Sequence, residues 1–269
     1  MTEPTTSRTA EWDAAAYYRL SNPHAVWGQP VLDRLPLRGD ETVLDAGCGA
    51  GRVTADLLER LPGGRVIALD ISANMLAEAR QQLARRFGDR VTFIQADLQD
   101  FTLDEPVDAI FSTAAFHWVL DHPRLFSALF AALKPGGGLV AQCGGGPNIT
   151  AVLERAAALM ESEPYAPHFA GWPGPWEFAS AEITSERLRD AGFVDIETSL
   201  ESKPTLMLDA NEYRDYLSTV VFGSHLDRLP DGRPRREFIE TLTEQAASDA
   251  PPFLLDYWRL NMGCRRPTE

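Results

Sequence analysis

The sequence predicts an α/β fold built on a doubly wound, seven-stranded and mainly parallel sheet. Two observations carry this prediction. Strand-like and helix-like runs alternate up to about residue 143, and such alternation implies parallel strands joined by crossover helices. Further helical stretches then follow the fifth and the sixth strand, so we expect these insertions to form a helical lid over one edge of the sheet.

The first five strands are short apolar runs, and the helices between them carry apolar residues at helical spacing. Val53, Leu57 and Leu61 share one face of the first helix. Ser72 is a good N-cap for the second helix, and Pro135 with the glycines behind it closes the third. The expected strands are residues 42–47, 65–71, 91–97, 107–114 and 138–144, and the expected helices are residues 52–61, 72–87 and 122–137.

The second half of the chain is expected to complete the sheet and to supply the lid. Residues 194–202 and 253–266 are the expected sixth and seventh strands. Helices are expected at 151–161 and 180–193, separated by an ordered loop at 163–178 that is rich in proline and aromatic residues. Two more helices, at 209–223 and 233–248, lie between the last two strands.

Composition and charge narrow the possible functions. The chain has 269 residues and a formal net charge of −14, with no dense basic run, which argues against a nucleic-acid or anionic-membrane partner. No apolar run approaches the roughly 20 residues of a membrane helix, and the first residues lack the pattern of a signal peptide. We therefore expect a cytoplasmic protein. Cys48, Cys143 and Cys264 lie far apart, so neither a disulfide framework nor a metal site is expected.

A glycine-rich turn follows the first strand in "VLDAGCGAGRVT". Its glycines at 47, 49 and 51 give G-x-G-x-G, whereas a dinucleotide-binding turn reads G-x-G-x-x-G. Arg52 stands at the third required position. Asp45, two residues ahead of Gly47, would repel a pyrophosphate but attract an ammonium group. The turn therefore disfavours a nicotinamide-dependent oxidoreductase, which we keep as a distant alternative.

Three successive strands end in acids, Asp45, Asp70 and Asp97. In an open parallel sheet, ligands bind beyond these carboxyl ends. One carboxylate suits an ammonium group, either directly or through water or the loop backbone. The second suits a ribose diol and the third an exocyclic adenine amine. S-adenosylmethionine carries all three donor groups, and we predict it as the cofactor.

The sequence resembles the class I S-adenosylmethionine-dependent methyltransferases over about residues 30–145. Four ordered motifs carry the resemblance: "VLDAGCGAGRVT", "VIALDIS", "FIQADLQDF" and "ALKPGGGLV". The resemblance implies a Rossmann-like methyltransferase fold in which the glycine loop approaches the methionine end and the second-strand acid holds the ribose. The donor-site residues implied in this part of the chain are Asp45, Gly47, Gly49, Gly51, Asp70, Ile71, Asp97, Leu98 and Ala114.

A narrower likeness concerns "STAAFHWVLDHPRLF", residues 112–126, which is similar to trans-aconitate methyltransferases and related carboxyl methyltransferases. It implies methyl transfer to a carboxylate oxygen of a small molecule, with His117 and Trp118 as the catalytic candidates. His117 could donate a hydrogen bond to a carboxylate or act as a base. Trp118 could form the wall of the methyl pocket or donate its indole N–H.

The family resemblance also implies that the segment before the first strand folds over the donor. We expect a helical cap at residues 1–35, a donor-binding core at 36–146 and the rest of the sheet with the lid at 147–269, all in one continuous domain. Tyr18, with Tyr17, and Gln29 could close the donor pocket, whereas Trp27 is expected to pack. The helix that bears Val31, Leu32 and Leu35 should dock on the sheet.

The acceptor stays open at this level. A carboxylate is ionised near neutral pH and needs no general base, whereas a phenol or an amine usually needs one. O-, N- or C-methylation of another natural product, with His117 as base, is therefore an alternative, and so is a donor-binding protein without catalysis. A net charge of −14 repels a polycarboxylate, and local cations would have to offset this; the candidates are Arg214, Lys203, His168 and His225.

Overall fold

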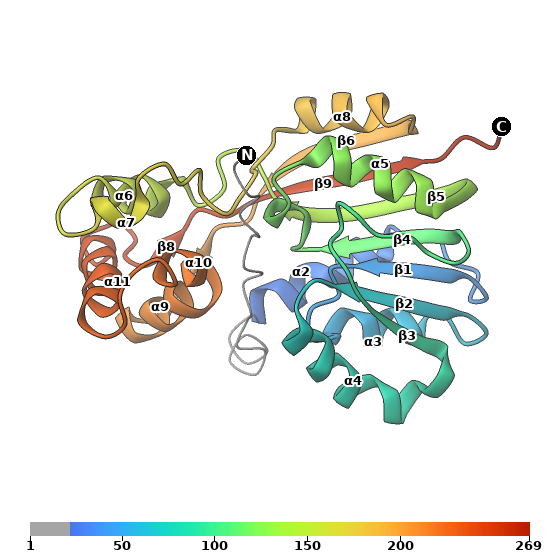
Figure 1. Cartoon of the computed structure of the whole chain (residues 1–269), viewed down its shortest axis with the longest axis horizontal. Coiled ribbons are helices and arrows are strands. Elements are labelled where there is room, and N and C mark those ends of the chain that lie inside the picture. Colours follow the sequence, from blue (N-terminus) through green and yellow to red (C-terminus); the bar gives the residue numbers. More distant parts are fainter. Residues whose placement is uncertain (1–21) are drawn as a thin grey trace, which may run out of the picture.

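The structure is a computed structural model that describes residues 22–269, with side chains from residue 27 onward. Its main sheet has seven strands in the order β3-β2-β1-β4-β5-β9-β6, and only β9 runs antiparallel to its neighbours (Figure 1). The doubly wound prediction is therefore confirmed. The strands are β1 (Thr42–Ala46), β2 (Arg65–Asp70), β3 (Val91–Gln95), β4 (Val107–Thr113), β5 (Leu133–Gly144), β6 (Val194–Ser202) and β9 (Trp258–Arg265).

Helices cover both faces of this sheet because apolar side chains alternate along each strand. In β1, Val43 joins the core beneath α2, α3 and α4, whereas Leu44 joins the core beneath α5 and α8. Val31 and Leu32 of α2 are buried in the first of these cores, as predicted. The covering helices are α2 (Asn22–Asp33), α3 (Arg52–Glu59), α4 (Ala73–Phe87), α5 (His122–Ala132) and α8 (Ala181–Asp190).

Local sequence signals set most of the helix ends. The hydroxyl of Ser72 accepts the Met75 N–H at 3.3 Å, which confirms the predicted N-cap of α4. The prediction of a helix over 122–137 was too long. α5 ends at Ala132, and the "KPGGG" run is instead the start of β5, in which Leu133 pairs with Val107 of β4. Proline disfavours helical geometry at the residue before it, so the helix stops early.

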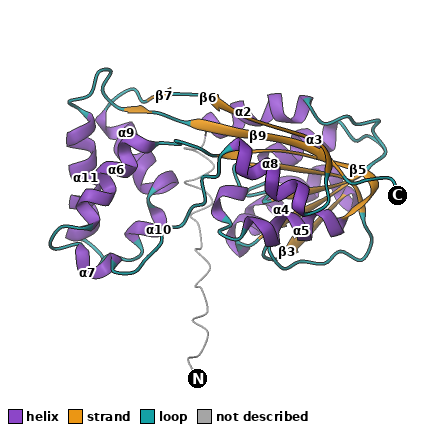
Figure 2. Ribbon diagram, turned by 90° about the horizontal axis from the view of Figure 1, so that it is seen from above, coloured by secondary structure: helices purple, strands orange, loops and turns teal. Residues whose placement is uncertain are grey.

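The predicted lid is present and forms a separate lobe (Figures 1 and 2). We define it as residues 149–178 and 203–257. The first segment follows β5 and holds α6 (Thr150–Met160) and α7 (Ala166–Phe169). The second lies between β6 and β9 and holds β7 (Thr205–Leu206), α9 (Ala210–Tyr216), a π-helical turn (Leu217–Val221), α10 (Gly223–Leu226), α11 (Arg233–Ala246) and β8 (Leu254–Leu255).

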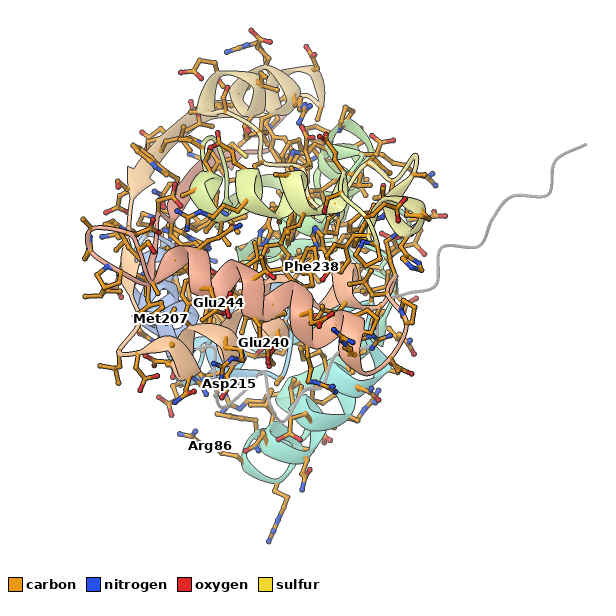
Figure 3. The ribbon with its side chains drawn as sticks, turned by 90° about the vertical axis from the view of Figure 1, so that its left-hand side faces the viewer. Arg86, Met207, Asp215, Phe238, Glu240 and Glu244 are labelled. Carbon is orange, nitrogen blue, oxygen red and sulfur yellow. The ribbon has the colours of Figure 1, made fainter. Side chains whose placement is uncertain are left out.

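The lid has its own apolar core. Figure 3 looks onto α11, whose Phe238 is buried while Glu240 and Glu244 are exposed. Tyr213, Tyr216, Phe222 and Leu242 belong to the same core. The predicted strand over 253–266 is divided here: β8 pairs with β7 inside the lid, and β9 pairs with β5 and β6 in the main sheet.

Two short helical turns complete the described chain, at Gly88–Arg90 and at Phe116–Trp118. Within residues 22–269, no helix is both long and apolar enough to cross a membrane. The same residues hold no cluster of three or more histidine, cysteine, aspartate or glutamate side chains suited to a metal ion. All three cysteines carry free thiols.

Candidate active site between the sheet and the lid

The glycine loop joins β1 to α3, and each of its three glycines has a positive φ, +81° at Gly47, +53° at Gly49 and +82° at Gly51. A Cβ on Gly47 would lie 2.3 Å from the Cβ of Ala115, and one on Gly51 would lie 2.8 Å from Leu83 Cδ1. A Cβ on Gly49 would meet nothing within 4 Å. Two glycines thus permit close packing, while the middle one borders open space that suits a bound donor.

Asp70 ends β2 beside this loop. Its Oδ2 accepts the Gly49 N–H at 2.8 Å, and its Oδ1 accepts the Ser72 N–H at 2.9 Å. The half-buried carboxylate therefore fixes the loop and the start of α4 at the same time. The role of Asp70 as acceptor of a ribose hydroxyl stays a prediction. Ile71, which follows it, is an exposed apolar side chain at the same edge of the sheet.

Asp45 lies beneath the glycine loop, only 3% exposed. Its Oδ2 accepts the hydroxyl of Thr54, in the first turn of α3, at 2.6 Å. Burial raises the pKa of Asp45 to about 7; the Thr54 hydrogen bond opposes this rise and the charge of Asp70 adds to it. The carboxylate supports the loop from below, and its predicted direct contact with an ammonium group stays a prediction.

Asp97 and Leu98 follow β3. The half-buried Asp97 carboxylate accepts the Gln99 N–H at 2.9 Å, so it shapes this turn and still lies at the edge of the sheet. The Leu98 side chain is buried in the core, and its Cδ1 lies 3.9 Å from the Cβ position of Gly47. Leu98 therefore supports the glycine loop by packing, and only its backbone could reach an adenine.

The predicted N-terminal contribution is only partly described, because Tyr17 and Tyr18 lie outside the described residues. The Gln29 amide donates to Asp56 of α3 and accepts from Arg60. Its side chain thus links α2 to α3, and the proposed closing of the donor pocket by Gln29 stays a prediction.

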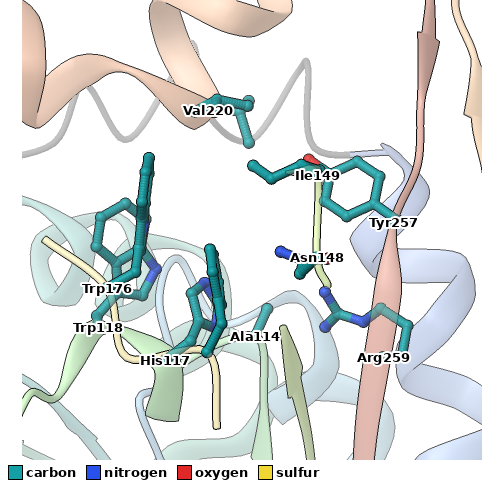
Figure 4. Close-up of a pocket in the computed structure, with 11 residues that line it drawn as sticks. Ala114, His117, Trp118, Asn148, Ile149, Trp176, Val220, Tyr257 and Arg259 are labelled. Carbon is teal, nitrogen blue, oxygen red and sulfur yellow. The ribbon is translucent and has the colours of Figure 1, made fainter. Parts of the chain in front are cut away.

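A pocket lies where the carboxyl ends of β4 and β5 and the start of β9 meet the lid (Figure 4). The three sequence candidates from the segment after β4 all contribute to it. Ala114 adopts a positive φ of +55° as it leaves the strand. The lining residues are Ala114, His117, Trp118, Asn148, Ile149, Trp176, Phe178, Val220, Val221, Tyr257 and Arg259.

His117 is held in one tautomer by its surroundings. Its Nδ1 accepts the Gly144 N–H at 3.3 Å, so in the neutral ring the proton is on Nε2. The ring stacks on Phe178 with centroids 5.7 Å apart and lies 5.4 Å from Trp118. The carbonyl of His117 accepts the Glu177 N–H at 2.9 Å, which ties this segment to the loop before α8. His117 therefore presents a hydrogen-bond donor on the side of the ring away from Gly144.

The sequence analysis missed Arg259, on β9. It is 2% exposed, its guanidinium lies 4.7 Å from the Trp27 ring centroid, and its Nε donates to Gln142 Oε1 at 3.4 Å. Figure 4 shows the guanidinium at the sheet side of the pocket, near Ala114. The arginine inside the otherwise uncharged run "YWRLNM" was the available signal, because a charged residue within an apolar run of a strand needs a specific reason.

Asn148, in the turn after β5, was missed as well. Its Oδ1 accepts the Trp258 N–H at 2.9 Å, which leaves the amide nitrogen to point the other way. Figure 4 shows this nitrogen directed into the pocket. Asn148, His117 and Arg259 thus each bring a hydrogen-bond donor to the lining of the pocket.

The cations proposed from the sequence lie elsewhere. None of Arg214, Lys203, His168 and His225 lines the pocket. Lys203 pairs with Glu201 at 2.6 Å. His225 is buried in the aromatic core of the lid, and this burial lowers its pKa to about 3, so it is neutral near pH 7.

The glycine loop after β1 and the pocket after β4 lie at the point where the strand order reverses, which is where doubly wound sheets bind nucleotides and their substrates. The fold and the glycine loop thus fit a protein that binds a nucleotide-type ligand at this edge of the sheet. Comparison with known proteins makes this specific. A family model described as a methyltransferase domain matches residues 43–137.

A trans-aconitate 2-methyltransferase from Methylobacterium radiotolerans is 36% identical over 256 residues, which cover 90% of this chain and 92% of the relative. Another, from Azoarcus sp., is 40% identical over 131 residues, 49% of this chain and 50% of the relative. The chain spans about half the length of the first curated relatives that it matches. The structure of Haemonchus contortus phosphoethanolamine N-methyltransferase 2 with S-adenosyl-L-methionine aligns with a TM-score of 0.61 at 20% identity, over 94% of this chain and 56% of that one.

The chain belongs to the class I S-adenosylmethionine-dependent methyltransferases, in the group of the trans-aconitate 2-methyltransferases. The predicted family is confirmed, and with it S-adenosylmethionine as the family's cofactor. The nicotinamide alternative is set aside.

Proposed function

We propose that this protein transfers the methyl group of S-adenosylmethionine to a carboxylate oxygen of a small acid. The observation that carries the proposal is the donor set of the pocket, formed by His117, Asn148 and Arg259. An ionised carboxylate only accepts hydrogen bonds, so it complements a lining that offers donors. A phenol, an amine or an alcohol would bring its own N–H or O–H against them.

In methyl transfer to a carboxylate, the main task of the protein is to position the two reactants. When bound, S-adenosylmethionine supplies a methyl group on a positively charged sulfur. The O–CH3 bond forms as the S–CH3 bond breaks, the electron pair stays on sulfur, and the opposite charges of the reactants disappear together. Arg259 and Asn148 can hold the carboxylate, and the aromatic wall of Trp118 and Trp176 excludes water around it.

The position of His117 favours a donor role over a base. A general base at Nε2 would require the tautomer with the proton on Nδ1, which would set that N–H against the Gly144 N–H. A carboxylate acceptor needs no base, because it is already ionised near neutral pH. The names of the relatives agree with this reading, since they describe methylation of trans-aconitate, a carboxylic acid.

The division of the chain is part of the proposal. Residues 36–146 would hold the donor, residues 147–269 would complete the sheet and enclose the acceptor, and residues 1–35 would cap the donor site. The acceptor is a small molecule, and we propose no nucleic-acid partner because the net charge is −14.

Matched acceptors test the proposal. The protein would be incubated with methyl-tritiated S-adenosylmethionine and one skeleton in three forms, cinnamic acid, cinnamamide and cinnamyl alcohol, with a phenol and an aryl amine alongside. We expect label in the acid alone. Transfer to the phenol or the amine, with none to any carboxylic acid in a wider panel, would contradict the proposal and restore His117 as a candidate base.

A further inference from the structure

We infer that the acceptor is a monocarboxylic acid with a largely hydrocarbon body, and not a polycarboxylate. The inference rests on the proposed function, because it concerns the acceptor of the same pocket. It is carried by two features of the lining: the number of charges, and the sides on which polar and apolar residues lie.

In the described part of its lining, the pocket offers one cation. Among the described residues that line it, Arg259 is the only arginine or lysine, and no acid is present. His117 and Asn148 add neutral donors to the same lining. One carboxylate can be satisfied there. A second or third carboxylate on the acceptor would lose its water without gaining a charged partner, which strongly disfavours binding.

Other cations near this edge of the sheet are engaged outside the pocket. Arg34 of α2 donates to the Ala141 carbonyl at 3.2 Å. Burial lowers the pKa of Arg34, and nearby Glu201 and Glu197 only partly oppose this. Lys203 pairs with Glu201. Neither side chain lines the pocket, so neither adds a second anchor to Arg259.

The lid side of the pocket is apolar. The lid contributes Ile149, Trp176, Phe178, Val220, Val221 and Tyr257 to the lining, and none of these side chains carries a charge. Trp176 stacks on Phe178 with centroids 5.6 Å apart and an interplanar angle of 17°. The hydroxyl of Tyr257 lies 3.0 Å from that of Tyr216, inside the lid core. This wall suits a hydrocarbon chain or ring.

The two sides also fix the orientation of the acceptor. Figure 4 shows Arg259 and Ala114 on the sheet side of the pocket, and Val220 and Trp176 on the lid side. The sheet side adjoins the glycine loop, since Ala115 packs directly against Gly47. A carboxylate held by Arg259 therefore lies at the end nearer the donor, and the body of the acid extends between the lid residues.

The test compares kcat/KM for hexanoate, octanoate, decanoate and cinnamate with that for trans-aconitate, using labelled S-adenosylmethionine. We expect kcat/KM to rise about fourfold for each methylene added from hexanoate to decanoate. We expect kcat/KM for trans-aconitate to be at least a hundredfold lower than kcat/KM for decanoate. If trans-aconitate is the better acceptor, ester formation stands but this inference is overturned. Transfer only to a phenol or an amine would overturn both.

A matched pair of variants and a binding measurement complete the test. Val220→Thr places a hydroxyl in the apolar wall of the pocket at nearly constant side-chain volume. Val194→Thr makes the same exchange at an exposed position of β6, outside the pocket, and is the control. We expect Val220→Thr to lower kcat/KM for decanoate at least fivefold and Val194→Thr to leave it unchanged. Calorimetry with S-adenosylhomocysteine present should show tighter binding of decanoate than of trans-aconitate; tighter binding of trans-aconitate would overturn the inference even without turnover.

Discussion

Arg259→Met is expected to remove most acceptor turnover while the fold and the donor site remain. Methionine is unbranched and fills a comparable space among the buried neighbours of this 2%-exposed side chain. The exchange removes the 3.4 Å hydrogen bond from Arg259 to Gln142, which costs about 1 kcal/mol. The variant should therefore melt within a few degrees of the wild type, and its loss of activity should report on the acceptor.

The expected loss follows from the position of the guanidinium. The Coulomb attraction between the guanidinium and a carboxylate about 4 Å away is about 4 kcal/mol at an effective dielectric constant of about 20. Removal of one partner of a buried, hydrogen-bonded charge pair costs about 2–5 kcal/mol in measured complexes. The contacts of Arg259 with Trp27 and Gln142 form without an acceptor and do not favour the transition state. We therefore expect Arg259→Met to lose about 3 kcal/mol of transition-state stabilisation, which is roughly a 150-fold loss in kcat/KM.

The assay measures kcat/KM for a carboxylic acid with labelled S-adenosylmethionine, and donor affinity by calorimetry. Arg265→Met on the same strand is the matched control, because that side chain is 55% exposed and lies outside the pocket. A loss below threefold in Arg259→Met, or an equal loss in the control, would refute the anchor role. So would an equal loss of donor affinity.

The remaining predictions concern the donor site and His117. Gly49→Ala and Gly171→Ala both place a Cβ at positive φ in open space, at a cost of about 1 kcal/mol in stability each; only Gly49→Ala should weaken S-adenosylmethionine binding, by tenfold or more in calorimetry. Asp70→Asn should weaken the same binding by about 2 kcal/mol, roughly thirtyfold, because a charged acceptor is lost; unchanged affinity would remove the ribose assignment. Burial raises the pKa of Asp45 to about 7, so the folded chain keeps a proton that the unfolded chain releases near its ordinary pKa, about 4, and stability falls as the pH rises between these values. Asp45→Asn should remove this fall and raise Tm relative to the wild type at pH 8 but not at pH 4; equal shifts at both pH values would contradict the assignment. His117→Ala should lower kcat more than donor affinity and leave the shape of the pH profile between pH 6 and 9 unchanged; the loss of a rising limb would show instead that His117 acts as a base.

The fold of the first half of the chain was predictable because its determinants are local. The glycine loop, the acids at or just beyond the ends of β1, β2 and β3, and the N-cap at Ser72 each occupy a few consecutive residues. Backbone conformation and strand order then bring them to one edge of the sheet without further information. The errors in this half concern element ends, such as the early stop of α5 at Ala132.

The acceptor half was less predictable because it depends on distant contacts. Arg259 reaches the pocket only because β9 runs antiparallel between β5 and β6, which puts its first residues at the edge where the parallel strands end. Asn148 is oriented by the backbone of Trp258, a residue 110 positions away. Gln29 shows the reverse case: its place near the donor site in sequence did not reveal that α3 engages its amide.

The most direct test of the account asks which bond the transferred methyl group forms. The product of a reaction with methyl-tritiated S-adenosylmethionine and a carboxylic acid would be treated with mild alkali, and the label released as methanol would be counted. A methyl ester at the carboxylate held by His117, Asn148 and Arg259 predicts near-complete release. Label that stays in an alkali-stable product would mean an ether, amine or carbon methyl group, and would contradict carboxyl methylation by this site.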